Sequence, residues 1–316
     1  MLNRFIKYTK IGKKTLFKHK EVIKLRYKQY ESTTEFYQAT YSILLKDEAQ
    51  NSIPLGNVIL GNSGGEPEGW RNPVNWYMAT VSDESNQVLL VAIMTPPFNI
   101  TLYETDNIPN DEALDCFCEN LCAENIEVPG VTSTNELAKR FANKYTSIKK
   151  MKYEVHMNMR VYTLEEVNKS IPLVGVLRKA SMNDIYFLPY WINLFSVECK
   201  IIGQTLDEAL VLVKRAIEKE ILWVLEDNGL PVAITGIVRE IVNGCTIGMV
   251  YTPPYYRGKG YASSSVAQVT QIALDRGCKY VTLNTDLDNP TSNSIYQKIG
   301  YNPICDCNEL RFITEK

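Results

Sequence analysis

The segment from residue 246 to residue 262, TIGMVYTPPYYRGKGYA, contains residue types that could bind phosphate. An apolar run and two prolines precede Arg257-Gly258-Lys259-Gly260, and a helical pattern begins at Tyr261. A turn that leads into a helix leaves backbone N–H groups unpartnered at the positive end of the helix dipole. The two glycines permit positive φ and close approach of a ligand to the backbone. The pattern therefore predicts a site for phosphate or pyrophosphate.

The elements around this turn follow a fixed order. Apolar residues recur at helical spacing over residues 261–276 and end at Gly277, which suits a helix C-terminus. Residues 280–283 favour a strand, and residues 291–299 favour a short helix that ends at Gly300. Walker-type and dinucleotide-binding motifs do not fit, because no Gly-Lys-Ser/Thr closes the loop and Ser263 stands where a third glycine would be.

With these motifs in place, the chain resembles the GCN5-related N-acetyltransferase family. RGKGYA matches the pyrophosphate loop of that family, and NPTSNSIYQKIGY, residues 289–301, matches its next motif. One departure is Tyr255, where the family usually has Gln or Arg. The resemblance implies a set of coenzyme-binding residues: Met249, Val250, Tyr251, Tyr256, Arg257, Gly258, Lys259, Gly260, Tyr261, Ala262, Asn289, Asn293 and Tyr296.

The resemblance also implies a reaction, the direct transfer of an acetyl group from acetyl-CoA to an amine. A backbone N–H in the strand around Met249 to Tyr251 is expected to stabilise the thioester oxygen. Tyr296 lies at the family's general-acid position, and a phenol pKa of roughly 10 suits proton donation to a thiolate. For the general base, the candidates are Glu198 and Glu240, with Asp286 as another. A non-catalytic acyl-CoA sensor that uses the same loop is the alternative.

The N-terminal part of the chain is expected to be a diverged copy of the same fold. Val88–Phe98, VLLVAIMTPPF, echoes residues 247–255, IGMVYTPPY, and helical and strand patterns follow it in similar order, but no glycine loop is present. We therefore expect an α+β architecture in two tandem copies, each a mixed, mostly antiparallel sheet flanked by helices. The expected divisions are a basic arm over residues 1–30, a degenerate domain over 31–167 and a catalytic domain over 168–316.

Composition restricts the partners. The net charge of −2 gives no overall attraction for nucleic acid or membranes, and no apolar run is long enough to span a membrane or to form a secretory signal, so a cytoplasmic location is expected. The eight cysteines do not show zinc-binding spacing, so we expect no metal. We expect a small-molecule amine or amino-acid-like acceptor. Aromatic side chains between residues 186 and 195 could line its pocket or belong to the core.

Overall fold

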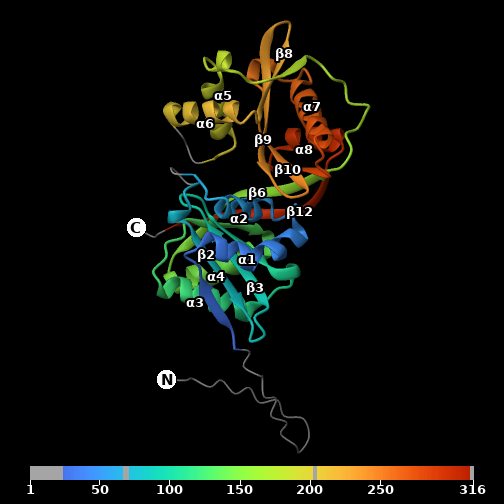
Figure 1. Ribbon diagram of the computed structural model, residues 1–316. Coiled ribbons are helices and arrows are strands. Elements are labelled where there is room, and N and C mark those ends of the chain that lie inside the picture. Colours follow the sequence, from blue (N-terminus) through green and yellow to red (C-terminus); the bar gives the residue numbers. More distant parts are fainter. Residues whose placement is uncertain (1–23, 67–70, 202–204, 314–316) are drawn as a thin grey trace, which may run out of the picture.

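The chain forms one twelve-stranded sheet that is divided into two halves (Figure 1). The computed structural model describes residues 24–66, 71–201 and 205–313. In the N-terminal half the elements are β1 (Arg26–Gln29), α1 (Thr33–Leu44), α2 (Ser52–Asn62), β2 (Tyr77–Ser82), β3 (Val88–Met94), β4 (Ile100–Glu104), α3 (Asp111–Ala123), β5 (Gly130–Thr134), α4 (Asn135–Lys149) and β6 (Lys152–Leu164).

The C-terminal half repeats this order of strands and helices. Its elements are β7 (Val176–Lys179), α5 (Leu188–Glu198), α6 (Leu206–Glu218), β8 (Leu222–Asp227), β9 (Leu230–Glu240), β10 (Gly244–Tyr251), α7 (Tyr261–Asp275), β11 (Tyr280–Asp286), α8 (Pro290–Ile299) and β12 (Asn302–Ile313). Helix-forming segments alternate with apolar strands in both halves, and within each half the helices lie on both faces of the sheet. Within the described ranges, no helix has the length and apolar character that a membrane crossing requires.

The strand order shows that the two halves exchange their last strands. Across the sheet the order is β1-β2-β3-β4-β5-β12-β6-β11-β10-β9-β8-β7. β12, the last strand of the chain, pairs with β5 of the N-terminal half, and β6 pairs with β11 of the C-terminal half. β6 and β12 pair with each other along most of their length and cross the middle of the molecule together (Figure 1). The order is therefore symmetric about the β6–β12 pair.

Buried side chains follow the same exchange. Leu310 of β12 is fully buried in a core formed by α3, α4 and the strands of the N-terminal half. Tyr162 and Leu164 of β6 are buried in the core beneath α7 and α8. Burial of a large apolar side chain contributes about 1.5–3 kcal/mol to stability. Each half therefore depends on a strand that the other half supplies.

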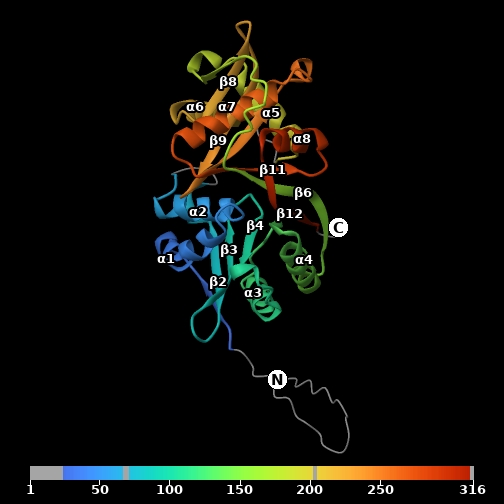
Figure 2. The ribbon, with the colours of Figure 1, turned by 90° about the vertical axis from the view of Figure 1, so that its right-hand side faces the viewer.

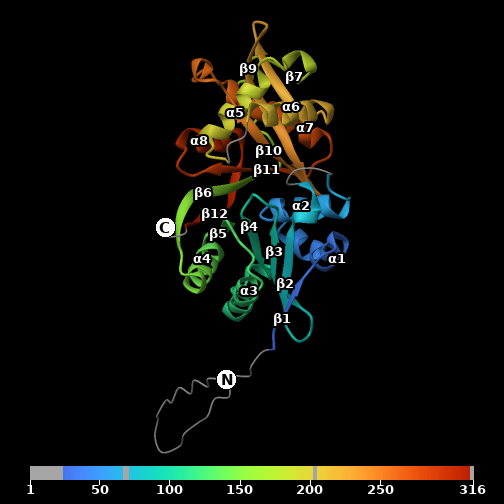
Figure 3. The same ribbon diagram turned by 90° about the vertical axis from the view of Figure 1, so that its left-hand side faces the viewer.

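Each sheet half is covered by helices on both faces. Figures 2 and 3 show α1 and α2 on one side of the N-terminal strands and α3 and α4 on the other. Alternation along β8 shows the same arrangement in the C-terminal half: Leu222 and Val224 pack beneath α5 and α6, whereas Trp223 packs on the α7 side. This period-two alternation is what a sheet with two buried faces requires.

The sheet corrects the sequence comparison between the halves. Val88–Phe98 was matched with residues 247–255, but its strand β3 corresponds by sheet order to β9. The counterpart of β10 is β4, because β4 pairs in parallel with β5 as β10 pairs in parallel with β11. The shared Thr-Pro-Pro-aromatic motif therefore does not mark equivalent positions. The expectation of two copies nevertheless agrees with the repeated order of elements.

Two further expectations concern the basic arm and the boundary between the two halves. The basic arm over residues 1–30 lies outside the described residues up to residue 23, and Arg26–Gln29 is the edge strand β1, which pairs with β2. The boundary expected between residues 167 and 168 falls in the connection from β6 to β7. Several strands were not predicted: β1, β2, β4 and β12.

Candidate functional site

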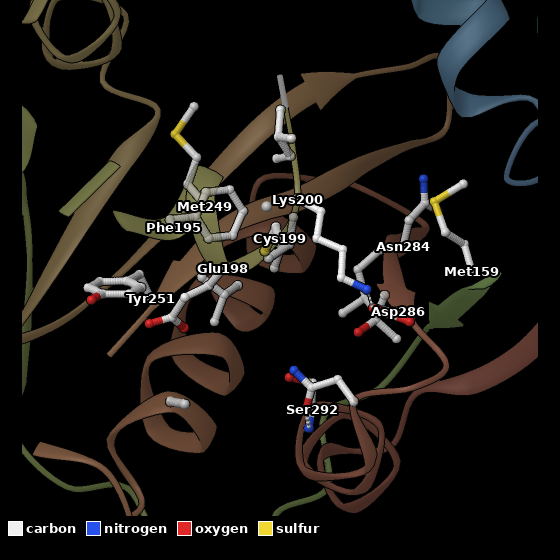
Figure 4. A pocket seen from close by; sticks show the side chains of 18 of the residues that line it. Met159, Phe195, Glu198, Cys199, Lys200, Met249, Tyr251, Asn284, Asp286 and Ser292 are labelled. Atoms are coloured by element: carbon white, nitrogen blue, oxygen red, sulfur yellow. Dashed lines mark hydrogen bonds and ion pairs between the residues drawn. The ribbon is translucent and has the colours of Figure 1, made fainter. Parts of the chain in front are cut away.

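A large cavity lies where two neighbouring parallel strands separate. β10 and β11 pair only at residues 244–246 and 280–282, and the strands diverge beyond this point. Side chains from both strands, from α5 and from the segment 256–263 line a cavity of about 810 Å³ (Figure 4). Small-molecule sites typically enclose ~300–1,000 Å³. The splayed strands therefore form a cleft of the size that a large ligand needs.

A β-bulge places unpaired backbone on one wall of this cavity. Between the pairs Gly248–Gly236 and Tyr251–Ile234, β10 advances by three residues and β9 by two. Met249 adopts a left-handed backbone with φ of 52°, although it carries a side chain. A bulge of this kind removes backbone groups from the ladder and redirects them. Met249, Val250 and Tyr251 all line the cavity, so this stretch can present N–H donors to a ligand.

The glycine turn forms another wall of the cavity. Gly258 and Gly260 have φ of 77° and 81°, a conformation that favours glycine. A Cβ at Gly258 would meet no atom within 4 Å, so the space beside the backbone is open. Gly260 is the N-cap of α7, and no side chain caps the helix and no acidic residue lies in its first turn. The first N–H groups of α7 can therefore bind an anion.

Arg257 is held in place at the edge of this turn. Its Nε donates to the carbonyl of Thr252 at 2.8 Å, and its Nη2 lies 2.8 and 2.7 Å from the two carboxylate oxygens of Glu198. Most of the other residues expected in this stretch also line the cavity, namely Tyr256, Tyr261 and Ala262. Lys259 does not line it, and its ammonium lies 5.9 Å from the centre of the Tyr256 ring.

The motif after β11 contributes two of its three expected residues to the cavity. Asn289 and Tyr296 line the cavity, and Asn289 also caps α8 by accepting from the N–H of Ser292 at 3.0 Å. Asn293 does not line it. The Asn293 amide donates to the carbonyls of Asp286 and Asn289 at 2.8 Å, and its oxygen accepts from the Tyr162 hydroxyl at 2.9 Å. Asn293 therefore braces the turn between β11 and α8.

Tyr296 is a buried residue in the wall of the cavity. Its side chain is 8% exposed, and burial raises the pKa of the phenol well above its ordinary value, with a further increase from the nearby Cys199 thiol. The phenol therefore stays protonated at any working pH, but it is a weaker acid than a solvated tyrosine. Burial also raises the pKa of Cys199, which lines the same cavity, to about 11, so this thiol stays protonated and is a poor nucleophile.

The candidate bases fall in different places. Glu198, at the end of α5, lines the cavity but is paired with Arg257, and both side chains are 46% exposed. Asp286, at the end of β11, lines the cavity and lies 3.8 Å from the Lys200 ammonium, toward which Lys200 extends in Figure 4. Glu240 lies at the far end of β9, opposite Cys245, and does not line the cavity. The sequence expectation for Glu240 therefore has no geometric support.

The structure adds residues from both halves and from the exchanged strands to the cavity. Those that sequence analysis did not identify include Phe98, Asn99, Pro129, Met157, Met159, Lys200, Asn284, Ser292, Glu309 and Arg311. Ser292 lies within the motif at residues 289–301, whereas the others come from segments that are far apart in sequence and carry no recognisable motif. Of the expected aromatic residues, Phe195 lines the cavity, whereas Phe187 and Trp191 belong to the core beneath α5.

The corresponding turn of the N-terminal half is unsuited to anions. Asn110 caps α3 by accepting from the N–H of Ala113 at 2.8 Å, and Asp111 and Glu112 lie in the first turn. Carboxylates at this position repel a phosphate. Where β4 and β5 separate, the cavity measures about 40 Å³. In the described ranges, no three His, Cys, Asp or Glu side chains gather as they would around a metal ion.

Comparison with known proteins agrees with this architecture. The sequence model of the acetyltransferase (GNAT) family matches residues 188–301. A search for similar sequences among proteins with curated functions finds no match.

Solved structures of acetyltransferases match most of the chain. A GCN5-related N-acetyltransferase from Sphaerobacter thermophilus has a TM-score of 0.60 at 14% identity, covering 92% of this chain and 96% of its own. A GNAT-family acetyltransferase from Colwellia psychrerythraea has a TM-score of 0.57 at 12% identity, with coverage of 92% and 100%. A tandem GNAT protein from the clavulanic acid biosynthesis pathway has a TM-score of 0.55 at 11% identity, with coverage of 92% and 98%. These similarities extend over both halves and show the shared fold.

Proposed function

Because residues 188–301 belong to the acetyltransferase (GNAT) family, we propose that the chain transfers an acetyl group from acetyl-CoA directly to a primary amine. The observation that carries the proposal is a single cavity that contains the glycine turn, the β-bulge at Met249 and Tyr296. These features would supply an anion site, backbone donors and a proton donor within one cavity.

The residues present fit acetyl-CoA. The open N–H groups at the start of α7 would hold the pyrophosphate, and Arg257 would add a positive charge. A side chain at Gly258 would occupy the space in which phosphates approach the backbone. When bound, acetyl-CoA supplies the thioester carbonyl that the amine attacks. Backbone N–H groups of Met249 or Val250 would stabilise the negative charge that develops on its oxygen.

Two protons must move in this reaction. The amine loses a proton as its C–N bond forms, and we propose that Asp286 accepts this proton. Asp286 lines the cavity on β11, and the bulge at Met249 lies on β10, the neighbouring strand from which β11 diverges. Glu198, in contrast, is already bound to Arg257 through both carboxylate oxygens. The thiolate gains a proton as the C–S bond breaks, and Tyr296 would supply it. Replacement of Asp286 by Asn should therefore lower kcat more than replacement of Glu198 by Gln.

A non-catalytic acyl-CoA sensor is the second candidate. It is favoured by the ion pair between Glu198 and Arg257 and by the raised pKa of the Tyr296 phenol, since both features weaken the catalytic groups. A sensor would use the same anion site and would bind acetyl-CoA without turnover.

Calorimetric titration with acetyl-CoA, followed by thiol release with a panel of amines, tests the proposal. Binding with thiol release supports a transferase, whereas binding without release on any amine supports the sensor. Gly258→Val should abolish binding, because it strains a positive φ and fills the phosphate space. Gly277→Val is the matched control, since Gly277 has φ of 100°, open space around it and a position at the opposite end of α7. Equal binding by the two variants would contradict the assignment of the turn.

A further inference from the structure

One end of the cavity carries charged groups that the proposed reaction does not use. Glu309 and Arg311 of the exchanged strand β12 line the cavity together with Phe98 and Pro129 of the N-terminal half. The closest atoms of the Glu309 carboxylate and the Arg311 guanidinium are 3.7 Å apart, which is beyond hydrogen-bond distance. Their side chains are 24% and 38% exposed. Both groups can therefore hydrogen-bond to a ligand.

The opposite face of the same two strands carries an ion pair of a different kind. Arg160 of β6 and Asp306 of β12 form two hydrogen bonds of 2.6 and 2.9 Å. That bidentate geometry satisfies both partners and holds the strands together. His156 does not satisfy Glu309 in this way, because its Nε2 lies 3.9 Å from the carboxylate and 2.9 Å from the Lys200 carbonyl oxygen. The Glu309–Arg311 pair is thus not used to hold the strands together.

Strand register places this pair at a definite position relative to the reacting centre. Asp286 lies opposite Met159, and Met159 lies opposite Cys307, two residues before Glu309. With ~4.8 Å between strands and ~3.3 Å per residue, the Cα atoms of Asp286 and Glu309 are about 12 Å apart on the same face of the sheet. Met157 and Met159 line the cavity between them. Along this wall of the cavity, the Asp286 carboxylate is thus followed by two methionine side chains and then by the Glu309 carboxylate and the Arg311 guanidinium.

We propose that the acceptor is a free amino acid with a second amine on its side chain. Arg311 binds its α-carboxylate and Glu309 its α-ammonium, which are adjacent groups in the ligand as the two side chains are adjacent in the cavity. The methylene groups lie against Met157 and Met159, and the side-chain amine reaches Asp286 and the bulge at Met249. This assignment rests on the proposed function for the reaction and adds the acceptor class.

Matched amines test the role of the α-carboxylate. Thiol release is measured with L-lysine and L-ornithine and with cadaverine and putrescine, which are the same diamines without the carboxylate. Of the two amino acids, the one with the lower KM should have a KM at least tenfold lower than that of the diamine with the same carbon chain. Arg311→Gln should raise the KM for the amino acid at least tenfold and should not raise the KM for the diamine, which has no carboxylate for Arg311 to bind. Arg311→Lys should restore part of the affinity, since it keeps the charge without the bidentate fork.

Binding separates this proposal from the proposed function. L-lysine and L-ornithine are titrated calorimetrically into the wild-type protein, Arg311→Gln, Glu309→Gln and the control Lys139→Gln, with and without CoA. Lys139 is exposed on α4 and does not line the cavity. Binding that is lost in the Arg311 and Glu309 variants and kept in the control supports the acceptor site, even if acetyl-CoA gives no turnover. Absence of amino acid binding to the wild-type protein, or equal binding by all variants, overturns it.

Discussion

Arg257 is bound by two groups of the protein, a backbone carbonyl and a carboxylate, with which a bound coenzyme would have to compete. In the structure its guanidinium contacts the Thr252 carbonyl and both oxygens of Glu198. The ion pair is half exposed, and exposed pairs of this kind contribute only ~0–1 kcal/mol. A pyrophosphate, which carries more charge and more acceptors, can compete for the same donors. If the turn binds acetyl-CoA as proposed, the Glu198 carboxylate would compete with the coenzyme for Arg257.

This competition predicts the effect of removing the carboxylate. Glu198→Gln should tighten acetyl-CoA binding by up to about fivefold, because breaking an exposed ion pair costs up to about 1 kcal/mol. Calorimetry at low and physiological ionic strength checks this, with Glu165→Gln as a charge-matched control on an exposed segment. Weaker binding by Glu198→Gln would mean that Glu198 itself contacts the coenzyme.

The protonation state of Tyr296 gives a second prediction at this scale. Its phenol pKa is raised by burial, so the proton is retained as the pH rises through 10, the ordinary value. In the wild-type protein, kcat should therefore show no decrease from loss of this acid between pH 8 and pH 10. Tyr296→Phe should lower kcat by about a hundredfold, within the range for general acids, and leave acetyl-CoA affinity unchanged.

The measurements are thiol release across this pH range and calorimetric titration of the variant. A decrease in wild-type kcat above pH 9 that is absent in Tyr296→Phe would contradict the raised pKa. Unchanged kcat in Tyr296→Phe would remove Tyr296 from the acid role.

Among the elements, β5 and β12 make the closest backbone contact at a glycine. A Cβ on Gly130 would lie 2.1 Å from the Leu310 carbonyl oxygen and 2.6 Å from Oδ1 of Asn99. Gly130→Ala should therefore force the exchanged strand away and cost at least ~1–3 kcal/mol, as overpacking does. Denaturant unfolding measures this cost. Thr134→Ala is the control on the same strand, because its side chain makes no capping hydrogen bond. Equal stability of the two variants would contradict the close docking of β12.

Sequence analysis identified the elements that carry local signals. The glycine turn, the helix that follows it and the short helix ending at Gly300 have Gly positions and helical spacing that depend only on neighbouring residues. The bulge at Met249 lies within the strand stretch expected to supply the oxyanion donor. Local signals therefore predicted the elements that form this wall of the cavity.

The remaining elements depend on contacts that the sequence does not show. β12, NPICDCNELRFI, lacks a clear apolar alternation, because its partners lie in both halves and Leu310, one of its buried residues, belongs to the distant core. The match between Val88–Phe98 and residues 247–255 rested on a proline turn that two non-equivalent strands share. Glu309 and Arg311 reach the cavity only because β12 is exchanged, so no spacing in the sequence could have identified them.

At the scale of the whole molecule, the exchange joins both halves into one structure around the cavity. The wall that contains the glycine turn comes from the C-terminal half, and the opposite wall comes from the N-terminal half and the β6–β12 pair. The N-terminal half is therefore part of the cavity wall. A further link is Glu48, which accepts from the backbone N–H and the side-chain amide of Asn243 at 2.8 Å.

The exchange predicts that a core mutation weakens the half that is more distant in sequence. Leu310→Ala, near the C-terminus, should lower amide protection in α3, α4 and the strands they cover, because Leu310 is buried in that core. Leu164→Ala, in β6, should lower protection beneath α7 and α8. Each change should cost ~2–5 kcal/mol, as cavity-forming leucine substitutions do. Hydrogen exchange with mass spectrometry locates the loss, and loss confined to each residue's own half of the sequence would show that the strands are not exchanged.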